Sequence, residues 1–247
     1  MPILRAGRGG GRMESAAERF YRKSHATNLR DGGKSAGDDA AEAAAIDRPS
    51  HRYYPLARHL DEQVGQNVVE LGYGSSGMAN ALAGKASSYT IVDVVKRHGD
   101  LDVAENIRFV QSDLNNDFPF QDEQFDCVAA MMVFEHLFDP FHSFREARRI
   151  VRPGGAVIVN LPNIASIRCR LQLLRGKMPV TSSADWFEKE EWDGNHLHSF
   201  TIDDTLRLAR HVGLKFVSLY AVGNHLWLKS LAPGFFCHEI GYVFERP

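Results

Sequence analysis

A glycine-rich turn and two acidic side chains are spaced in a way that suits an adenosine-containing cofactor. Glu70 lies at the end of an apolar run, and the turn Gly-Tyr-Gly-Ser-Ser-Gly occupies residues 72–77. Gly72 and Gly74 permit a tight turn and close approach of the backbone to a ligand, and a following helix would offer free N–H groups. Asp93 ends a second β-rich run roughly 20 residues downstream, where its carboxylate can accept hydrogen bonds from ribose hydroxyls.

Glu70 distinguishes between two classes of cofactor. A ribose-binding acid such as Asp93 is common to sites for NAD and for S-adenosylmethionine. Glu70 lies two residues before the first glycine, where dinucleotide-binding folds usually have an apolar residue. A carboxylate there can reach the cationic amino group of a methionine moiety, so the pattern favours S-adenosylmethionine. The alternative is that both acids are ordinary strand-end residues.

Three of the 11 histidines are candidate general bases. His136, in the pair Glu135-His136, follows the apolar run at residues 125–133, while His196 and His198 precede a predicted helix. Histidine is the usual base near neutral pH. The alternative is that the Glu-His pair shapes the pocket or caps a helix and that the other two histidines hold a loop in place. No Asp/His spacing demands a metal ion, and we predict none.

The segments that must position these residues alternate between strand and helix. Apolar and β-rich runs predict strands at residues 67–71, 89–95, 107–111, 125–133 and 156–160. Helical periodicity predicts helices after residue 77, over 136–151 and over 201–211, and Arg-Pro-Gly-Gly at 152–155 is expected to end the second. This alternation predicts right-handed crossovers and a parallel sheet. Ligands of such sheets bind at the carboxyl ends of the strands.

Six short motifs, taken together in order and spacing, resemble the class I S-adenosylmethionine-dependent methyltransferases, especially the type 11 branch of small-molecule enzymes. They are Val-Glu-Leu-Gly-Tyr-Gly at 69–74, Val-Asp at 92–93, Gln-Ser-Asp-Leu at 111–114, Phe-Asp-Cys-Val at 125–128, Phe-Glu-His-Leu at 134–137 and Arg-Pro-Gly-Gly at 152–155. The resemblance covers residues 51–247. It implies a single α/β domain with a doubly wound, seven-stranded, mostly parallel Rossmann-like sheet, whose final strands are residues 217–221 and antiparallel 241–245.

The resemblance also implies roles for seven residues. It places Glu70, Gly72 and Gly74 near the methionine moiety and Asp93 at the ribose. It places Asp113 and Leu114 beside the adenine, and Met131 closes the pocket. The implied activity is methyl transfer from S-adenosylmethionine to oxygen of a small-molecule or glycan-type acceptor. N- or C-methylation of another metabolite is the alternative within this class, because it can dispense with a base. An NAD(P)-dependent oxidoreductase and a non-catalytic scaffold are alternatives from other classes. Glu70 and the Glu-His and Arg-Pro-Gly-Gly motifs disfavour the oxidoreductase, and the set of Glu70, Asp93 and Asp113 disfavours the scaffold.

Residues 163–200 are long for a connection between core elements, and we predict that they form a substrate lid. Aliphatic residues recur there at helical spacing among arginines, and Trp186, Phe187 and Trp192 follow. The aromatic rings suit stacking on a sugar or another ring. The aliphatic stripe is equally consistent with helix packing, with a partner or with peripheral contact with a membrane.

Composition sets the remaining limits. The chain has 247 residues, a formal net charge of −2 and 44% hydrophobic residues, so it can bury a core and lacks the basic surplus of a nucleic-acid-coating protein. Three separated cysteines and no long apolar run predict a cytoplasmic protein without a transmembrane segment.

Residues 1–50 hold 7 of the 21 glycines and few large aliphatics, which predicts a mostly disordered tail in which Met13 is an alternative start. The oligomeric state is not defined by these features.

Overall fold

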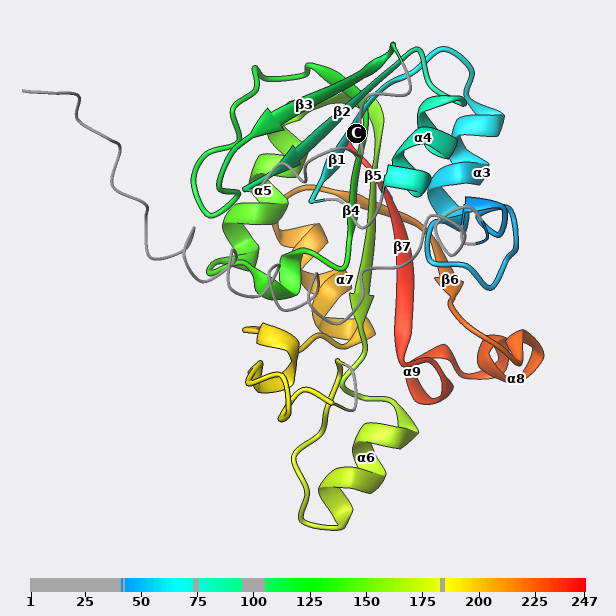
Figure 1. Ribbon diagram of the computed structural model, residues 1–247, viewed down its shortest axis with the longest axis vertical. Coiled ribbons are helices and arrows are strands. Elements are labelled where there is room, and N and C mark those ends of the chain that lie inside the picture. Colours follow the sequence, from blue (N-terminus) through cyan, green and yellow to red (C-terminus); the bar gives the residue numbers. More distant parts are fainter. Residues whose placement is uncertain (1–40, 42, 73–75, 95–104, 183–184) are drawn as a thin grey trace, which may run out of the picture.

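The computed structural model describes residues 41, 43–72, 76–94, 105–182 and 185–247 (Figure 1). Within these residues seven strands form one sheet in the order β3-β2-β1-β4-β5-β7-β6. The strands are β1 (Asn67–Leu71), β2 (Ser88–Asp93), β3 (Ile107–Gln111), β4 (Phe125–Met131), β5 (Val151–Pro162), β6 (Lys215–Ala221) and β7 (Glu239–Glu245). Only β7 runs antiparallel, to both β5 and β6. The expected doubly wound, mostly parallel fold in a single domain is confirmed.

Helices cover both faces of this sheet (Figure 1). One face packs against α3 (Tyr54–Glu62) and α4 (Ser76–Ala83), and the other packs against α5 (Pro140–Ile150) and α7 (Ile202–His211). Because successive strand residues point to opposite faces, Val68 joins the core beneath α3 and α4 while Val69 joins the core beneath α5 and α7. The same alternation places Glu70 on the face covered by α3 and α4.

The predicted helix over residues 136–151 is wrong at its start. The chain first forms a short 3₁₀ turn, η1 (Phe134–His136), and α5 then begins separately at Pro140. Proline fixes its own φ and disfavours a helical conformation in the residue before it, so Asp139 is extended, with φ −129° and ψ 103°. The Asp139 carboxylate accepts a hydrogen bond from the Phe141 N–H, which caps the new helix.

The predicted bounds of five strands also need correction; two of these, β6 and β7, each start two residues earlier than predicted, at Lys215 and Glu239. β5 starts at Val151, directly after α5, so the Arg-Pro-Gly-Gly segment lies within a strand. Gly154 has φ +74° there, and its N–H donates to the Arg246 carbonyl. β4 ends at Met131 because Met132 turns into the left-handed region at φ 59°. β2 ends at Asp93, and the rest of its predicted span reaches Val95, which lies outside the described residues.

The lid segment (residues 163–200) lies beyond the carboxyl end of β5 (Figure 1). It contains α6 (Ile167–Leu174) and the short helix η2 (Trp192–Asn195). Two further short helices, α8 (Leu226–Leu231) and α9 (Pro233–Phe236), connect β6 to β7 near the same end of the molecule. Arg170 of α6 lies over the Phe235 ring of α9 at 5.7 Å, which joins the lid segment to this connection.

Most of the predicted tail, including Met13, lies outside the described residues. Its described end contributes Ile46, which is buried in the core beneath α3 and α4. In the part of the chain that the structure describes, no helix is both long enough and apolar enough to cross a membrane.

Candidate functional site

Gly72 brings three strand ends together. Its N–H donates to the Val92 carbonyl at 2.7 Å, which ties the end of β1 to the end of β2. Its φ is +68°, and a Cβ atom at this position would lie 2.7 Å from Cγ2 of Val133, two residues beyond β4. Any larger side chain would therefore be strained and would meet Val133. The predicted cofactor-binding position thus lies where β1, β2 and β4 converge; Gly74 lies outside the described residues.

Glu70 is a buried carboxyl held by two phenol groups. Tyr53 donates to Oε1 at 2.7 Å and Tyr89 donates to Oε2 at 2.8 Å. Burial raises the pKa of Glu70 from its ordinary value of 4.5 to about 7, more than the two tyrosine hydrogen bonds lower it. The charge of Asp93 raises this pKa further. A cationic group beside Glu70 would favour its ionised form.

The other predicted cofactor residues lie at the same edge of the sheet. Asp93 ends β2 and is only 8% exposed, and Met131 ends β4 and is buried. Asp113 follows β3 in a turn in which its Oδ1 accepts hydrogen bonds from the backbone and side-chain nitrogens of Asn115. Leu114 beside it is buried. This arrangement provides an acidic strip with an apolar flank, as an adenosine group and an ammonium group would require.

A second group of polar side chains forms where the lid segment meets the end of β4. Three possible metal-ligand atoms, one each from Glu135, His136 and His196, lie within 4.8 Å of one another. The rings of His136 and His196 are 4.7 Å apart between centroids, and His196 Nε2 lies 4.0 Å from Glu135 Oε1. Glu135 is completely buried, and neither carboxyl oxygen has a hydrogen-bond partner among the described residues. Burial raises the pKa of Glu135 from 4.5 to about 8.

Hydrogen-bond partners define which nitrogen of each ring carries hydrogen. His136 Nδ1 lies 3.2 Å from the Asn195 carbonyl, which can only accept, so Nδ1 is the donor. Thr181 donates its hydroxyl hydrogen to Asp193 at 2.9 Å and therefore accepts from His196 Nδ1 at 2.7 Å. In both rings the lone pair is consequently on Nε2. Burial lowers the pKa of His196, which favours this neutral form.

His198 has a different environment from the other two histidines. Its ring Nε2 lies 3.1 Å from the Phe138 carbonyl, and the residue is half-buried. The backbone N–H groups of Leu197 and His198 both donate to the Glu135 carbonyl, at 2.7 and 3.1 Å. Of the three predicted bases, the structure thus brings His136 and His196 together and gives His198 a contact of its own.

The sequence patterns did not indicate four residues of the site. Tyr53 and Tyr89 hold Glu70, and Thr181 and Asp193 orient His196. Tyr89 could have been found, since it lies in a predicted strand beside β1 and points to the same face as Glu70. The other three reach the site through loop conformations that have no periodic signal.

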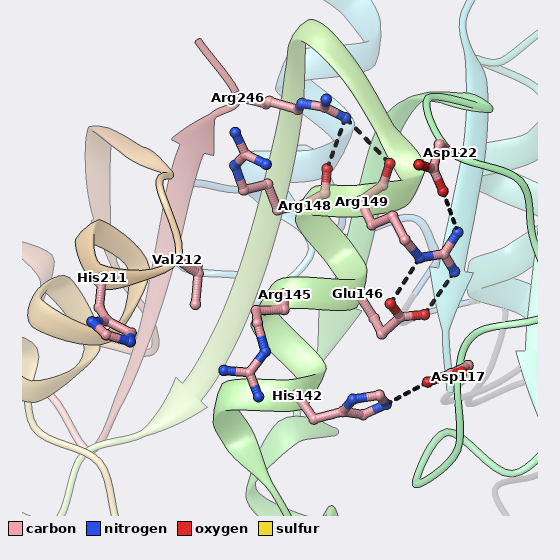
Figure 2. Close-up of a pocket in the computed structure, with 10 residues that line it drawn as sticks. All are labelled: Asp117, Asp122, His142, Arg145, Glu146, Arg148, Arg149, His211, Val212 and Arg246. Carbon is pink, nitrogen blue, oxygen red and sulfur yellow. Dashed lines mark hydrogen bonds and ion pairs between the residues drawn. The ribbon is translucent and has the colours of Figure 1, made fainter.

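A polar hollow of about 510 Å³ lies along α5 (Figure 2), and none of the residues that line it belongs to the two groups described above. Its charges are largely paired: Arg149 bonds to Glu146 and Asp122, and Arg246 bonds to the carbonyls of Arg148 and Arg149. Arg149 also donates to two carbonyls of the loop before β4. Arg149 therefore holds this loop against α5.

Known proteins resemble the chain in sequence over part of its length. A family model described as a methyltransferase domain matches residues 69–159, which run from β1 to β5. The ubiquinone biosynthesis O-methyltransferase of Erwinia tasmaniensis is 28% identical over 127 residues, a match that covers 47% of this chain and 52% of that protein. The chain thus spans about half the length of this curated relative.

Solved structures show the same fold at low sequence identity. A methyltransferase from Haloferax volcanii, in complex with the Trm112 activator, is 17% identical, with a TM-score of 0.59 and coverage of 85% of this chain and 98% of that chain. An S-adenosylmethionine-dependent methyltransferase from Mesorhizobium loti is 15% identical, with a TM-score of 0.58 and coverage of 79% and 98%. At such identities the likeness concerns the fold alone.

The sheet order and its flanking helices define a Rossmann-like fold. The methyltransferase domain that matches residues 69–159 supports a class I S-adenosylmethionine-dependent methyltransferase, as the sequence motifs indicated. Family and fold imply S-adenosylmethionine as the cofactor and favour it over NAD.

Proposed function

We propose that the protein transfers a methyl group from S-adenosylmethionine to oxygen of a small-molecule or glycan-type acceptor. The observation that carries the cofactor assignment is the pair of buried carboxyls, Glu70 and Asp93, at adjacent strand ends. Glu70 suits the cofactor's ammonium group and Asp93 suits its ribose, with Gly72 keeping the turn open for close approach. The sulfonium supplies the activated methyl group, so the main tasks of the protein are alignment and exclusion of water.

Two observations support oxygen as the acceptor atom. A hydroxyl must lose its proton as its oxygen attacks the methyl carbon, and the Nε2 lone pairs of His136 and His196 can accept a proton. Relatives such as the Erwinia protein are named as O-methyltransferases. N- or C-methylation is the competing outcome, and it would leave turnover insensitive to these two histidines. His198 stays a third candidate base.

The lid segment supports a ring-containing or sugar acceptor. The Trp186 and Trp192 rings are 5.0 Å apart between centroids, and Phe187 is 5.5 Å from Trp186. Phe187 is 71% exposed and Trp192 is 67% exposed, so both rings can stack on a ligand. The Trp192→Ala variant is expected to raise the KM for the acceptor while S-adenosylhomocysteine binding stays unchanged.

Calorimetry with S-adenosylhomocysteine and with NAD tests the cofactor assignment. We expect binding of the former and none of the latter, and the reverse result would refute the proposal. Transfer of labelled methyl groups from S-adenosylmethionine to a panel of phenols, sugars and amines then identifies the acceptor atom. Products methylated only on nitrogen or carbon would overturn the oxygen assignment.

We also propose a cytoplasmic location without a nucleic-acid partner. The three cysteines are buried and unpaired, which suits a reducing compartment. Fractionation of cells that produce the protein tests this proposal, since recovery in an oxidising compartment would contradict it.

A further inference from the structure

The group formed by Glu135, His136 and His196 has the composition of a metal site. Two imidazoles and one carboxylate contribute one ligand atom each, all within 4.8 Å of one another. The three come from two separate parts of the chain, the 3₁₀ turn after β4 and the end of the lid segment. Ligands of one ion at bond lengths of about 2.0–2.2 Å lie about 3–4 Å apart, so small side-chain rotations suffice to close the group around an ion.

Glu135 supplies an independent observation. Its carboxyl group has no exposed surface, and neither oxygen has a hydrogen-bond partner among the described residues. A buried polar group without partners is costly, and a bound ion is one of the few ways to satisfy it. A cation between Glu135 and the two imidazoles would coordinate the carboxylate oxygens of Glu135 and neutralise their buried negative charge.

The partners of the two imidazoles are those of metal-ligating histidines. A histidine ligand usually donates its second ring N–H to a carbonyl or a carboxylate, which fixes its orientation. His136 donates to the Asn195 carbonyl, and His196 donates to Thr181, whose hydroxyl in turn donates to Asp193. Asp193 is itself held by the backbone N–H groups of Thr181 and Ser182. Both Nε2 lone pairs are thereby oriented as ligands.

We propose that Glu135, His136 and His196 bind a divalent transition-metal ion of the Zn²⁺, Fe²⁺ or Co²⁺ class. Two imidazole ligands favour such ions over Mg²⁺ and Ca²⁺, which prefer oxygen. This proposal departs from the metal-free site expected from residue spacing, because the three ligands meet only in the folded chain. Three protein ligands leave a position for water or for the acceptor's oxygen. That catalytic role rests on the proposed function, and in it the bound ion, in place of an imidazole Nε2, would activate the acceptor's hydroxyl; binding of the ion itself does not rest on that function.

The test uses the full chain without a histidine tag, freed of metal by a chelator. Titration with Co²⁺, followed by visible absorption, is expected to show one bound ion per chain, and calorimetry with Zn²⁺ gives the affinity. His196→Ala and Glu135→Gln are expected to weaken binding by about 100-fold or more, and Thr181→Val by about 10-fold. His198→Ala is the matched control and is expected to bind like the wild type. Glu135→Gln keeps the shape of the side chain, and circular dichroism verifies its fold.

Several results would overturn the site. These are no Co²⁺ binding by the wild type, equal affinity in wild type, Glu135→Gln and His196→Ala, or preference for Mg²⁺ over Co²⁺. Binding of S-adenosylhomocysteine and methyl transfer are measured on the same samples. If the wild-type protein bound the metal ion but not S-adenosylhomocysteine, the proposed function alone would be refuted. If the wild-type protein transferred methyl groups but bound no metal ion, the metal site alone would be refuted.

Discussion

At the scale of single residues, the proposed role of Glu70 would make cofactor binding depend on pH. Its carboxyl is 1% exposed and accepts hydrogen bonds from Tyr53 and Tyr89. Burial dominates over these bonds, so the pKa of Glu70 lies near 7. The side chain is therefore easily protonated when no cation is nearby, and the ammonium group of a cofactor would favour the carboxylate. Binding of S-adenosylhomocysteine should consequently strengthen as the pH rises through 7.

The Glu70→Gln variant should lose part of the pH dependence of stability. The folded-state pKa of about 7 lies above the ordinary 4.5, so the folded chain binds the extra proton between these values. This contribution is full below pH 4.5 and is lost as the pH rises through 7, a difference of about 3 kcal/mol. Urea unfolding at pH 5 and pH 8 should show a smaller fall for Glu70→Gln than for the wild type. Equal falls in the two proteins would contradict the burial argument.

The Asp93→Ala variant should weaken binding of S-adenosylhomocysteine by about 1–3 kcal/mol, because it removes a charged hydrogen-bond acceptor for the ribose. Calorimetry at constant pH measures the loss. Asp117→Ala is a suitable control, since that carboxylate is exposed and lines the polar hollow along α5. An affinity for Asp93→Ala equal to that of the control would remove Asp93 from the cofactor site.

At the scale of elements, regular strands were the most predictable part. β1 and β3 have the predicted bounds because their apolar runs lie between clear turns. Asp139-Pro140 is a strong helix-start signal, yet the predicted helix starts too early. The reason is that the helical spacing of apolar residues extends back to Leu137, before this signal. The approach of His196 to Glu135 could not be predicted at all. It depends on a 38-residue segment folding back onto β4 through Thr181 and Asp193.

The Asp139→Ala variant should destabilise the protein by about 1 kcal/mol, because it removes the side-chain cap of α5. Urea unfolding followed by far-UV circular dichroism measures the change. Asp139→Asn keeps an oxygen that can accept from the Phe141 N–H and should retain most of the stability. If the alanine and asparagine variants were equally unstable, the cap would not be the cause.

At the scale of the whole molecule, one sheet connects the two hydrophobic cores. Residues of β1, β4 and β5 contribute alternately to the core beneath α3 and α4 and to the core beneath α5 and α7. Opening either core therefore disrupts the strands shared by both. The existence of these buried parallel strands was predictable for this reason, since each carries apolar residues for both faces, whereas the seven-stranded sheet with an antiparallel last strand was implied by the resemblance.

Ligand binding should stabilise the molecule as a whole. S-adenosylhomocysteine at 100 times its dissociation constant should raise the free energy of unfolding by about 2.7 kcal/mol, if it binds only the folded chain. Thermal unfolding with and without the ligand measures the shift. NAD at the same concentration is the control, and a comparable shift with NAD would contradict the cofactor assignment.

The two backbone hydrogen bonds from Leu197 and His198 to the Glu135 carbonyl have a consequence for substrate access. They fasten the carboxyl-terminal end of the lid segment to the turn after β4. A motion of the lid segment that preserves these two bonds leaves His196 beside Glu135. The acceptor would then exchange with solvent while the imidazole and the buried carboxyl stay together between turnovers.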